Sequence, residues 1–426
     1  LFVDLTARAD GSSKFGENRK YGFFPAVSAA WRVIQEPFMQ PLAWVSDLKL
    51  RGSYGLTGNA GAIDPLLSLP LVGSGSGYTI NGAYSTGISP GRIANPDLGW
   101  EQSVQADLGL DVGLFGDRLN LVVDVYNKRT NGLLFVKSLP LSSGYPNLTG
   151  NFAEIGNRGV ELSADARILD GPLKWSVNGN FSVNRNKLVA LPNGQQEIIP
   201  DGAFTYSILQ VGQPIGIFRT YVFDGIYQAD EPVLPGSGSR TGGVKVRDVN
   251  GDGQITTGDQ VVTGNANPDF IFGFSTNLAY KGFDLAAFVT GVQGNEVFNL
   301  TRYLFENPLG ARNVLAGMAD RWTPDNPNNE YTNGFQGGRL PVSDRFMENG
   351  SFVRLRNVTL GYTLPPVKGV YRARVYVSAN NPVTFTRYSG YDPEVNTFGG
   401  NNVRVGIDNG VYPLAKSLLG GLQVTF

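Results

Sequence analysis

The chain has 426 residues, of which 56 are glycine and only 17 % are charged. This length fits two or three ordinary domains or one large β architecture, and a glycine content nearly twice the usual ~7 % favours strands and turns. Lys and Arg number 35 against 36 Asp and Glu, so no cationic excess supports nucleic-acid binding. Because the chain has no Cys and no His, disulfides, thiolate nucleophiles, imidazole bases and the triads that depend on them are excluded.

Apolar residues are spread along the chain rather than collected in runs. No run reaches the ~20 residues that a membrane-spanning helix requires, although 41 % of residues are hydrophobic. Dispersal by alternation is typical of transmembrane β-barrels. Residues 1–5 already alternate, with no initiator Met and no signal peptide before them. We therefore expect a fragment or processed piece of a longer protein.

Twelve strands are predicted from this alternation. In one of them, Val160 and Leu162 share one parity while Glu161 and Asp165 share the other. A soluble sandwich would show the same pattern, with one face on a core and the other in water. In chain order the predicted strands are 1–10, 23–34, 46–57, 102–114, 117–127, 157–169, 171–186, 266–281, 282–294, 349–364, 372–384 and 414–426.

The lengths of the connections favour the barrel over the sandwich. From the third strand onward, short and long links alternate, as do the periplasmic turns and extracellular loops of outer-membrane barrels. The short links are 115–118, 170–172, 280–283 and 365–369. The long links, which this parity places outside the cell, are 58–101, 128–156, 187–265, 295–348 and 385–413.

One strand breaks the alternation. Arg354 and Arg356 share parity with Val358 and Leu360, which would turn two charges toward lipid. A charge at the bilayer midplane costs about 2 to 4 kcal/mol. The strand therefore needs either a β-bulge near Asn357 or a position of the arginines above the membrane, and we predict the bulge.

Seven short motifs are spread along the chain. They are LKLRGSYG at 48–55 with TGN at 57–59, NPDLGWE at 95–101, IGNRGVEL at 155–162, GQPIG at 212–216, DGIY at 224–227, RWTPDNP at 321–327 and YDPE at 391–394. In these motifs the chain resembles one known family, the SusC/RagA-like TonB-dependent outer-membrane transporters of Bacteroidetes. The resemblance covers essentially the whole chain, and the motifs occur in the family's order.

The resemblance implies an architecture and a function. Residues 1–426 would be the C-terminal part of a plugged transmembrane antiparallel β-barrel with ~22 strands. The missing N-terminal part would carry the plug and the contact with the TonB energy transducer. The protein would be a non-enzymatic importer in the outer membrane of a Gram-negative bacterium. It would pass a large oligosaccharide or oligopeptide, with a SusD-like surface lipoprotein docked on the long loops.

A metal site is predicted in the third long link. Residues 248–259 match the spacing of a calcium loop, with oxygen donors at positions 1, 3 and 5, glycine at 6, a backbone carbonyl at 7 and a carboxylate at 12. The alternative is an Asn- and Gly-rich turn closed by Asx hydrogen bonds. The predicted Ca²⁺ ligands are Asp248, Asn250, Asp252, the Gln254 carbonyl, Asp259 and, directly or through water, Thr256.

Substrate contacts are expected from the lumen wall and from loop aromatics, which can hydrogen-bond or stack on sugars and peptides. A hydrated wall, an aromatic girdle and ordinary loop packing are the alternatives. The candidates are Asn178, Asn180, Asn184, Tyr206, Tyr221 and Tyr227.

Two other functions fit the same sequence features. One is an outer-membrane scaffold or secretion-associated barrel that binds partner proteins. The other is a soluble, calcium-stabilised β adhesin or carbohydrate-binding module.

Overall fold

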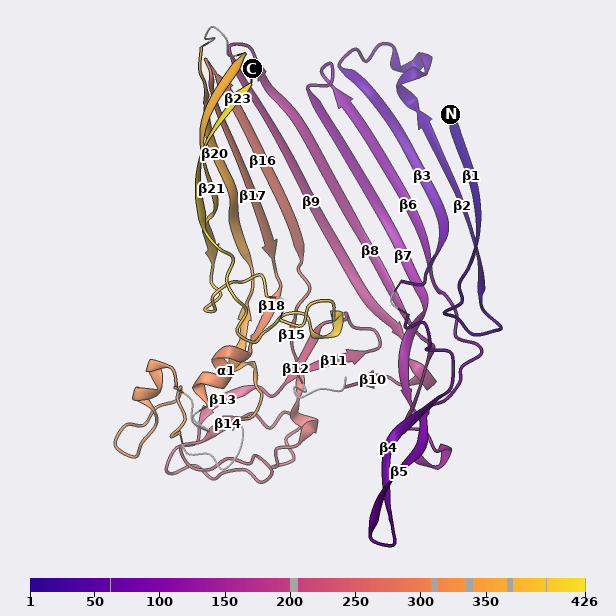
Figure 1. The fold of residues 1–426 in the computed structure, drawn as a ribbon. Helices are drawn as coiled ribbons and strands as arrows, with labels where there is room; N and C mark the ends of the chain where they lie inside the picture. Colours follow the sequence, from indigo (N-terminus) through magenta and orange to yellow (C-terminus); the bar gives the residue numbers. More distant parts are fainter. Residues whose placement is uncertain are drawn as a thin grey trace. The chain divides into compact units, whose positions relative to one another are not determined.

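The computed structural model describes residues 1–61, 63–199, 206–307, 313–334, 340–365, 371–395 and 397–425. The fold is all-β, and its largest sheet has twelve antiparallel strands (Figure 1). In spatial order these are β1 (Phe2–Gly11), β2 (Tyr21–Arg32), β3 (Val45–Asn59), β6 (Glu101–Leu114), β7 (Leu119–Ser138), β8 (Asn147–Asp170), β9 (Leu173–Ala190), β16 (Phe270–Tyr280), β17 (Phe283–Gln293), β20 (Phe352–Thr363), β21 (Arg372–Thr386) and β23 (Ser417–Thr425). The twelve predicted strands are confirmed.

Two of the predicted long links contain more strand than expected. The prediction at 128–156 is wrong for most of its length, because β7 and β8 continue as a paired hairpin and only residues 139–146 leave it. The link at 58–101 contains the hairpin of β4 (Leu71–Ile80) and β5 (Ala83–Arg92). Neither extension shows apolar alternation, so hydrophobic periodicity could not detect it. The predicted turn at 365–369 lies mostly outside the described residues.

The remaining elements are short. The strands are β10 (Glu197–Ile198), β11 (Ser207–Gln210), β12 (Ile217–Thr220), β13 (Phe223–Ile226), β14 (Val244–Val246), β15 (Val261–Asn265), β18 (Glu296–Asn299), β19 (Met347–Asn349) and β22 (Ile407–Asp408). The helices are α1 (Leu300–Glu306) and the 3₁₀ turns Val33–Gln35, Pro37–Met39, Leu141–Ser143, Pro192–Gly194, Thr257–Asp259, Ala316–Asp320, Asp344–Phe346 and Asn402–Arg404. In the described residues, no helix is both long enough and apolar enough to cross a membrane.

The chain forms two compact units. The first comprises residues 1–166, 184–197 and 210–213. On one face of its sheet, directly opposed residues of five successive strands form an apolar row. Several of them stay more than a third exposed, as expected of side chains that face lipid. The row is Trp31, Leu50, Leu110, Val123 and Leu162.

The opposite face of the same strands is charged. Arg51 pairs with Asp111 (Nη2–Oδ1 2.8 Å) and Asp124 (Nη2–Oδ1 2.9 Å), and Lys49 Nζ lies 2.6 Å from Asp111 Oδ2. Gly109 stands between Arg51 and Asp124 in the register, and a Cβ there would lie 2.6 Å from the Arg51 Cζ. Because Gly109 has no side chain, Arg51 of β3 can reach Asp124 of β7 across β6.

The second unit comprises residues 167–183, 198–209 and 214–426. Its strands β9, β16, β17, β20, β21 and β23 carry a row of opposed apolar and aromatic residues beside the tight turns. The rings of Phe283 and Tyr362 lie 4.5 Å apart, as in the aromatic girdle of a membrane barrel. The row is Leu173, Tyr280, Phe283, Tyr362, Val375 and Leu422.

The bulge predicted near Asn357 is confirmed. Leu355 and Asn357 pair with successive residues of β17, Val289 and Phe288, so Arg356 is the extra residue. The register with β21 shifts at the same point. Because the bulge changes the parity of the strand, Arg354 does not share a face with Leu360.

A separate core supports the loops of the second unit. It packs residues from β12, β13, β14, β18, α1 and β22, which lie at the end of β16, β17, β20 and β21 away from the tight turns (Figure 1). Phe298 of β18 is fully buried and lies between the rings of Tyr206, Tyr303 and Phe346. This core gives the long loops a fixed internal structure.

Candidate substrate-binding site

A cavity of about 860 Å³ opens in the second unit beside α1, β19 and the segment that follows β21. Its volume lies in the ~300–1,000 Å³ range of small-molecule sites. Most of the side chains that the following paragraphs describe line this cavity: Arg302, Glu306, Glu348, Arg387, Ser389, Tyr391 and Asp408.

Local sequence places the first guanidinium of the site. Asn299 caps α1, because its side chain accepts a hydrogen bond from the backbone N of Arg302 at 2.8 Å, and Asn is among the preferred N-cap residues. One helical turn later, Glu306 faces Arg302, with Nε to Oε1 at 2.6 Å. The capped turn therefore holds Arg302 at the cavity wall.

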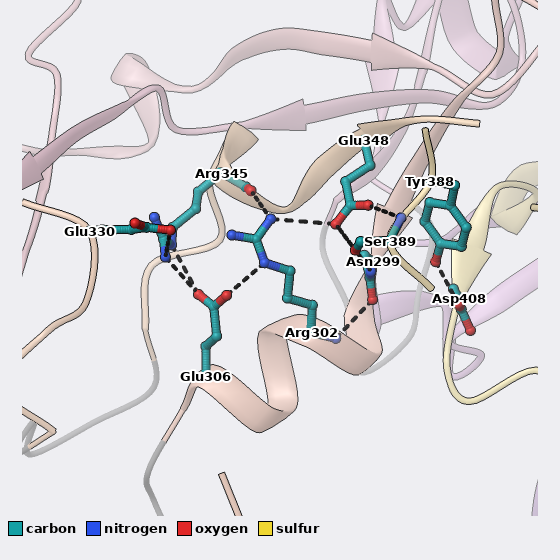
Figure 2. Close-up of polar contacts among 9 residues, drawn as sticks. All are labelled: Asn299, Arg302, Glu306, Glu330, Arg345, Glu348, Tyr388, Ser389 and Asp408. Carbon is teal, nitrogen blue, oxygen red and sulfur yellow. Dashed lines mark hydrogen bonds and ion pairs between the residues drawn. The ribbon is translucent and has the colours of Figure 1, made fainter. Parts of the chain in front are cut away.

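Glu306 joins two arginines, Arg302 and Arg345, that are distant from each other in sequence. Its Oε2 accepts a hydrogen bond from Arg345 Nε at 3.0 Å, while Oε1 faces Arg302 (Figure 2). The Glu306 side chain is only 4 % exposed and that of Arg345 is 9 % exposed. Burial opposes the charge on Arg302, but Glu306 and Glu348 outweigh it and raise the pKa of the guanidinium.

Glu348 fixes the opposite wall. Its carboxylate accepts hydrogen bonds from Asn299 Nδ2 (3.1 Å) and from the backbone N and Oγ of Ser389 (both 2.8 Å). Arg302 Nη1 lies 3.4 Å from the same carboxylate. Four donors therefore join β18, α1, β19 and the segment after β21 at one point (Figure 2).

A buried tyrosine–carboxylate pair lies beside this wall. Tyr388 donates its hydroxyl hydrogen to Asp408 Oδ2 at 2.5 Å, and Asp408 is 2 % exposed. Asp408 Oδ1 also accepts a hydrogen bond from the backbone N of Val411 at 3.0 Å. Burial and the neighbouring Asp408 raise the pKa of Tyr388, so the tyrosine stays a neutral donor at physiological pH.

Arg387 differs from the other cations of the cavity. It is exposed, and among the described residues it makes no ion pair or hydrogen bond. It also borders a second cavity, of about 520 Å³, which shares Asn349 with the first. An accessible guanidinium is a fork of donors that can bind a carboxylate, a sulfate or several hydroxyls.

A second ionic cluster anchors the segment after β21 to the barrel wall. Arg354, 2 % exposed, donates from Nη2 to Asp392 Oδ1 at 2.6 Å and from Nε to Thr384 Oγ1 at 2.8 Å. Glu394 pairs with both Arg354 and Arg356. Burial acts to raise the pKa of Asp392, but Arg354 and two backbone amides lower it. The YDPE motif thus supplies the counter-ions of the two strand arginines.

The predicted calcium loop is closed by its own backbone amides. Asp248 accepts hydrogen bonds from the N–H groups of Gly251 (2.7 Å) and Gly253 (2.8 Å). Asn250 and Asp252 each accept one from the residue two positions later, at 2.9 Å. In the described residues, no group of three or more acidic side chains converges as a metal site would require. The Asx-turn alternative therefore describes the loop geometry, and calcium stays a prediction.

Asp259 closes the same loop from its far end. It is fully buried and accepts hydrogen bonds from the backbone N of Thr256 (2.7 Å) and of Val249 (2.9 Å). The bond from Thr256 is the main reason that the pKa of Asp259 is lowered, and Asp248 contributes to the same shift. Thr256 also caps the 3₁₀ turn Thr257–Asp259, and Gln254 contributes a backbone N–H to Asp252.

Two of the three candidate tyrosines, Tyr206 and Tyr221, lie in or against the loop core, and Tyr227 is buried as well. Tyr206 and Tyr227 are each 1 % exposed, and Tyr206 stacks on Phe298 with ring centroids 4.3 Å apart. Tyr221 is partly buried against the same core. The rings of Tyr206 and Tyr227 therefore offer no exposed surface for stacking in this conformation, and a role for these residues in substrate contact stays a prediction.

The asparagine candidates lie on β9. Asn178 and Asn180 are opposite Ser275 and Gly273 of β16, on the parity opposite to Trp175. Asn184 accepts a hydrogen bond from the Tyr126 hydroxyl at 3.0 Å. These asparagines lie on the polar face of β9, as expected for residues of the lumen wall. A role for them in substrate contact stays a prediction.

Sequence reasoning missed the residues that build the cavity. Glu306 and Arg345 are 39 positions apart, and Glu348 and Ser389 are 41 apart, so no local pattern joins them. Two signals were available. Asn299 before α1 has the chemistry of an N-cap, and Arg302 and Glu306 have the i, i+4 spacing of a helical ion pair.

The twelve antiparallel strands, the apolar rows and the aromatic row define a β-barrel wall of the outer-membrane class. The family model described as "TonB dependent receptor-like, beta-barrel" matches residues 1–381. The chain belongs to this family, and it is of the SusC/RagA type. This assignment argues against the soluble adhesin or carbohydrate-binding module.

Relatives of the chain support the assignment. TonB-dependent receptor P3 of Formosa agariphila is 39 % identical over 99 % of this chain and 44 % of the relative. TonB-dependent receptor SusC of Bacteroides thetaiotaomicron is 29 % identical over 99 % of this chain and 42 % of the relative. The solved RagAB peptide transporter is 29 % identical, with a TM-score of 0.83 over 100 % of this chain and 45 % of that chain. The chain therefore spans less than half the length of these relatives.

Proposed function

We propose that this chain is the C-terminal part of the barrel of a TonB-dependent importer in the outer membrane of a Gram-negative bacterium. The observation that carries the proposal is the likeness to the RagAB peptide transporter over the whole chain. The apolar rows on the wall support a lipid-facing surface. The rest of the ~22-stranded barrel, the plug and the contact with TonB would belong to other parts of the protein.

The proposed cargo is an oligosaccharide or an oligopeptide, and the proposed role is transport rather than catalysis. The 860 Å³ cavity supports this reading, since carboxylates, amides and guanidinium groups line it together with the exposed ring of Tyr391. Such a lining can hydrogen-bond either cargo and stack on a sugar or a side chain. The long links, extracellular in this proposal, would dock a SusD-like lipoprotein that closes over the cargo.

Arg387→Ala tests the role of the cavity in uptake. We expect a several-fold loss of uptake of the cognate nutrient with no loss of folded protein, because Arg387 is exposed and supports no ion pair in the described residues. Radiolabelled uptake by cells with the complete transporter measures the effect. Arg404→Ala, at another loop arginine, is the comparison. Equal uptake by wild type and Arg387→Ala would place cargo binding elsewhere.

We also propose that residues 248–259 bind Ca²⁺ and so stiffen the extracellular link 187–265. The oxygen donors are those calcium prefers, and each carboxylate oxygen can accept an N–H and coordinate an ion, because it has two lone pairs. Asp248 lies close enough to Asp259 to lower its pKa, so two of the proposed ligands are already near each other.

Calcium removal should change the proteolysis of this link but not the barrel. Chelation of the full transporter is expected to speed cleavage within 187–265 several-fold, and millimolar Ca²⁺ should restore protection, whereas Mg²⁺ should not. Asp252→Asn weakens the ligand set and leaves the buried Asp259 intact. Identical cleavage with calcium and with chelator would contradict calcium binding and show that the Asx hydrogen bonds alone stabilise the loop.

A further inference from the structure

The connection between β2 and β3, residues 33–44, leaves its large apolar side chains uncovered. Phe38 is 60 % exposed, Trp44 is 52 % exposed and Leu42 is also exposed. In the neighbouring turn between β6 and β7, Phe115 is 58 % exposed. Its backbone N donates to the Trp44 carbonyl at 2.7 Å, and the two rings lie 6.4 Å apart. We call Phe38, Leu42, Trp44 and Phe115 the rim patch.

The connection at the other end of β2 buries its aromatic residue. In residues 12–20, Phe15 is 1 % exposed and packs on Leu98 and on the ring of Trp100, with ring centroids 4.7 Å apart. Burial of this kind is the usual arrangement of a large apolar side chain, and an exposed apolar group marks a contact with a partner or a membrane. The exposure of the rim patch is therefore not a property of every connection in this unit.

A hydrogen bond holds the start of the connection 33–44 beside the apolar face of the sheet. Trp31 and Leu50 are directly opposed in the apolar row of the first unit. Trp31 donates from Nε1 to Glu36 Oε1 at 2.8 Å. Because the Trp31 side chain is on the apolar face, the first turn of the connection lies next to that face as well.

Trp44 and Phe115 lie directly beyond the ends of two strands. Val45, the first residue of β3, pairs with Leu114, the last residue of β6. Leu114 has the same parity in β6 as Leu110, a member of the apolar row, so the apolar face continues to the end of the strand. The two aromatic residues therefore follow the apolar face at the height where the hydrocarbon of a bilayer ends.

The connection also carries little charge. Glu36 is the only charged residue from 33 to 46, and its carboxylate already accepts the indole hydrogen bond. Two prolines in the segment have no backbone N–H. The N–H groups of Leu42 and Val45 are satisfied in successive turns, at 2.9 Å each. Aromatic side chains with few charges and few free backbone donors suit the boundary between hydrocarbon and headgroups.

We propose that the rim patch lies in the headgroup region of the periplasmic leaflet and anchors this rim of the wall to the lipid surface. The inference rests on the membrane placement of the proposed function, with the tight turns in the periplasm. Lipid is the partner because the patch is continuous with the apolar face of the sheet. The anchor differs from an aromatic girdle, whose residues lie on strands, because most of it is a connection beyond the strand ends. It would fix the depth of β2 and β3 in the bilayer.

Depth-dependent fluorescence quenching in the complete transporter tests the anchor. The described chain has no Cys, so one introduced Cys is the only labelling site within it. With a nitrobenzoxadiazole label on Phe38→Cys in phosphatidylcholine nanodiscs, we expect a headgroup nitroxide lipid to lower the fluorescence at least about twofold. Aqueous iodide should have little effect. The control is Glu17→Cys, an exposed position at the other end of β2, which iodide should quench and the nitroxide lipid should not.

A pair of matched variants tests whether the apolar side chains cause the insertion. With the label on Leu42→Cys, Phe38→Glu/Trp44→Glu should abolish quenching by the nitroxide lipid and make the label accessible to iodide. Gln35→Glu/Gln40→Glu adds the same charge to exposed polar positions of the same connection and should leave the label in the lipid.

The outcomes separate the anchor from the proposed function. Quenching of the Phe38 label by iodide alone, in a transporter that inserts and imports, would overturn the anchor and leave transport intact. Protection of this label from both quenchers would show that protein rather than lipid covers the patch, and would also overturn the anchor. Failure of the wild-type transporter to insert into nanodiscs would contradict the membrane placement itself.

Discussion

Replacement of Glu306 by Gln should loosen the loop core of the second unit more than a change at any exposed carboxylate. Glu306 pairs with Arg302 and Arg345 and is almost completely buried. Removing one member of a buried ion pair typically costs ~3–5 kcal/mol, because the partner charge stays desolvated. We expect about 3 kcal/mol, at the lower end of that range, because Arg302 retains Glu348.

Hydrogen exchange measures this loss in the full transporter, because it reports the opening of each structural element separately. Amide exchange in α1 should accelerate about a hundredfold, by the relation of 1.4 kcal/mol to a factor of ten. Glu330→Gln is the matched control, because Glu330 is 60 % exposed and 3.9 Å from Arg345. Similar exchange in the two variants would show that the buried carboxylate does not hold α1 in place.

Arg354→Ala should release the segment that carries Tyr388, Ser389 and Tyr391. Without the guanidinium, the carboxylate of Asp392 stays 6 % exposed and loses its counter-ion. We expect a loss of about 3 kcal/mol in the local stability of residues 387–416. Faster proteolysis of this segment, with an intact barrel, gives the measurement. Cargo uptake should fall with it, since the segment lines the cavity.

Two further variants separate this ion pair from general damage. Arg356→Ala should cost less than about 1 kcal/mol, because Arg356 is 25 % exposed and solvent screens its pair with Glu394. Arg354→Ala/Asp392→Asn should be no less stable than Arg354→Ala alone, since the double variant leaves no buried charge unpaired. Strictly additive losses would show that the two residues do not act as a pair.

The wall could be predicted from sequence because its rules are local. Alternation at Val160 and Leu162 sets the face of a strand whatever its neighbours are, and the misplaced parity of Arg354 and Arg356 required a bulge. The alternation and the bulge can each be recognised from the sequence of a single strand. The hairpin β4–β5 escaped because its glycines and serines pair through the backbone without an apolar face.

The site could not be predicted in this way because it depends on contacts between distant segments. Glu348 is an ordinary charged residue in the sequence, and its four donors come from Asn299, Arg302 and Ser389. Tyr206 shows a different limit of sequence reasoning. An aromatic residue in a polar loop suggested an exposed binding surface, but the long links contain a core of their own, and the Tyr206 ring is buried in it.

The charged face behind Leu50 also has a consequence for assembly. Arg51 lies in the middle of β3, and Arg51, Asp111 and Asp124 are each one position away from the apolar row. A slip of one residue in strand pairing would exchange the two faces. It would then turn Arg51 toward hydrocarbon, at a cost of about 2 to 4 kcal/mol near the midplane. The ion network, with the space that Gly109 leaves for it, thus favours the native register over a misregistered hairpin as the barrel inserts.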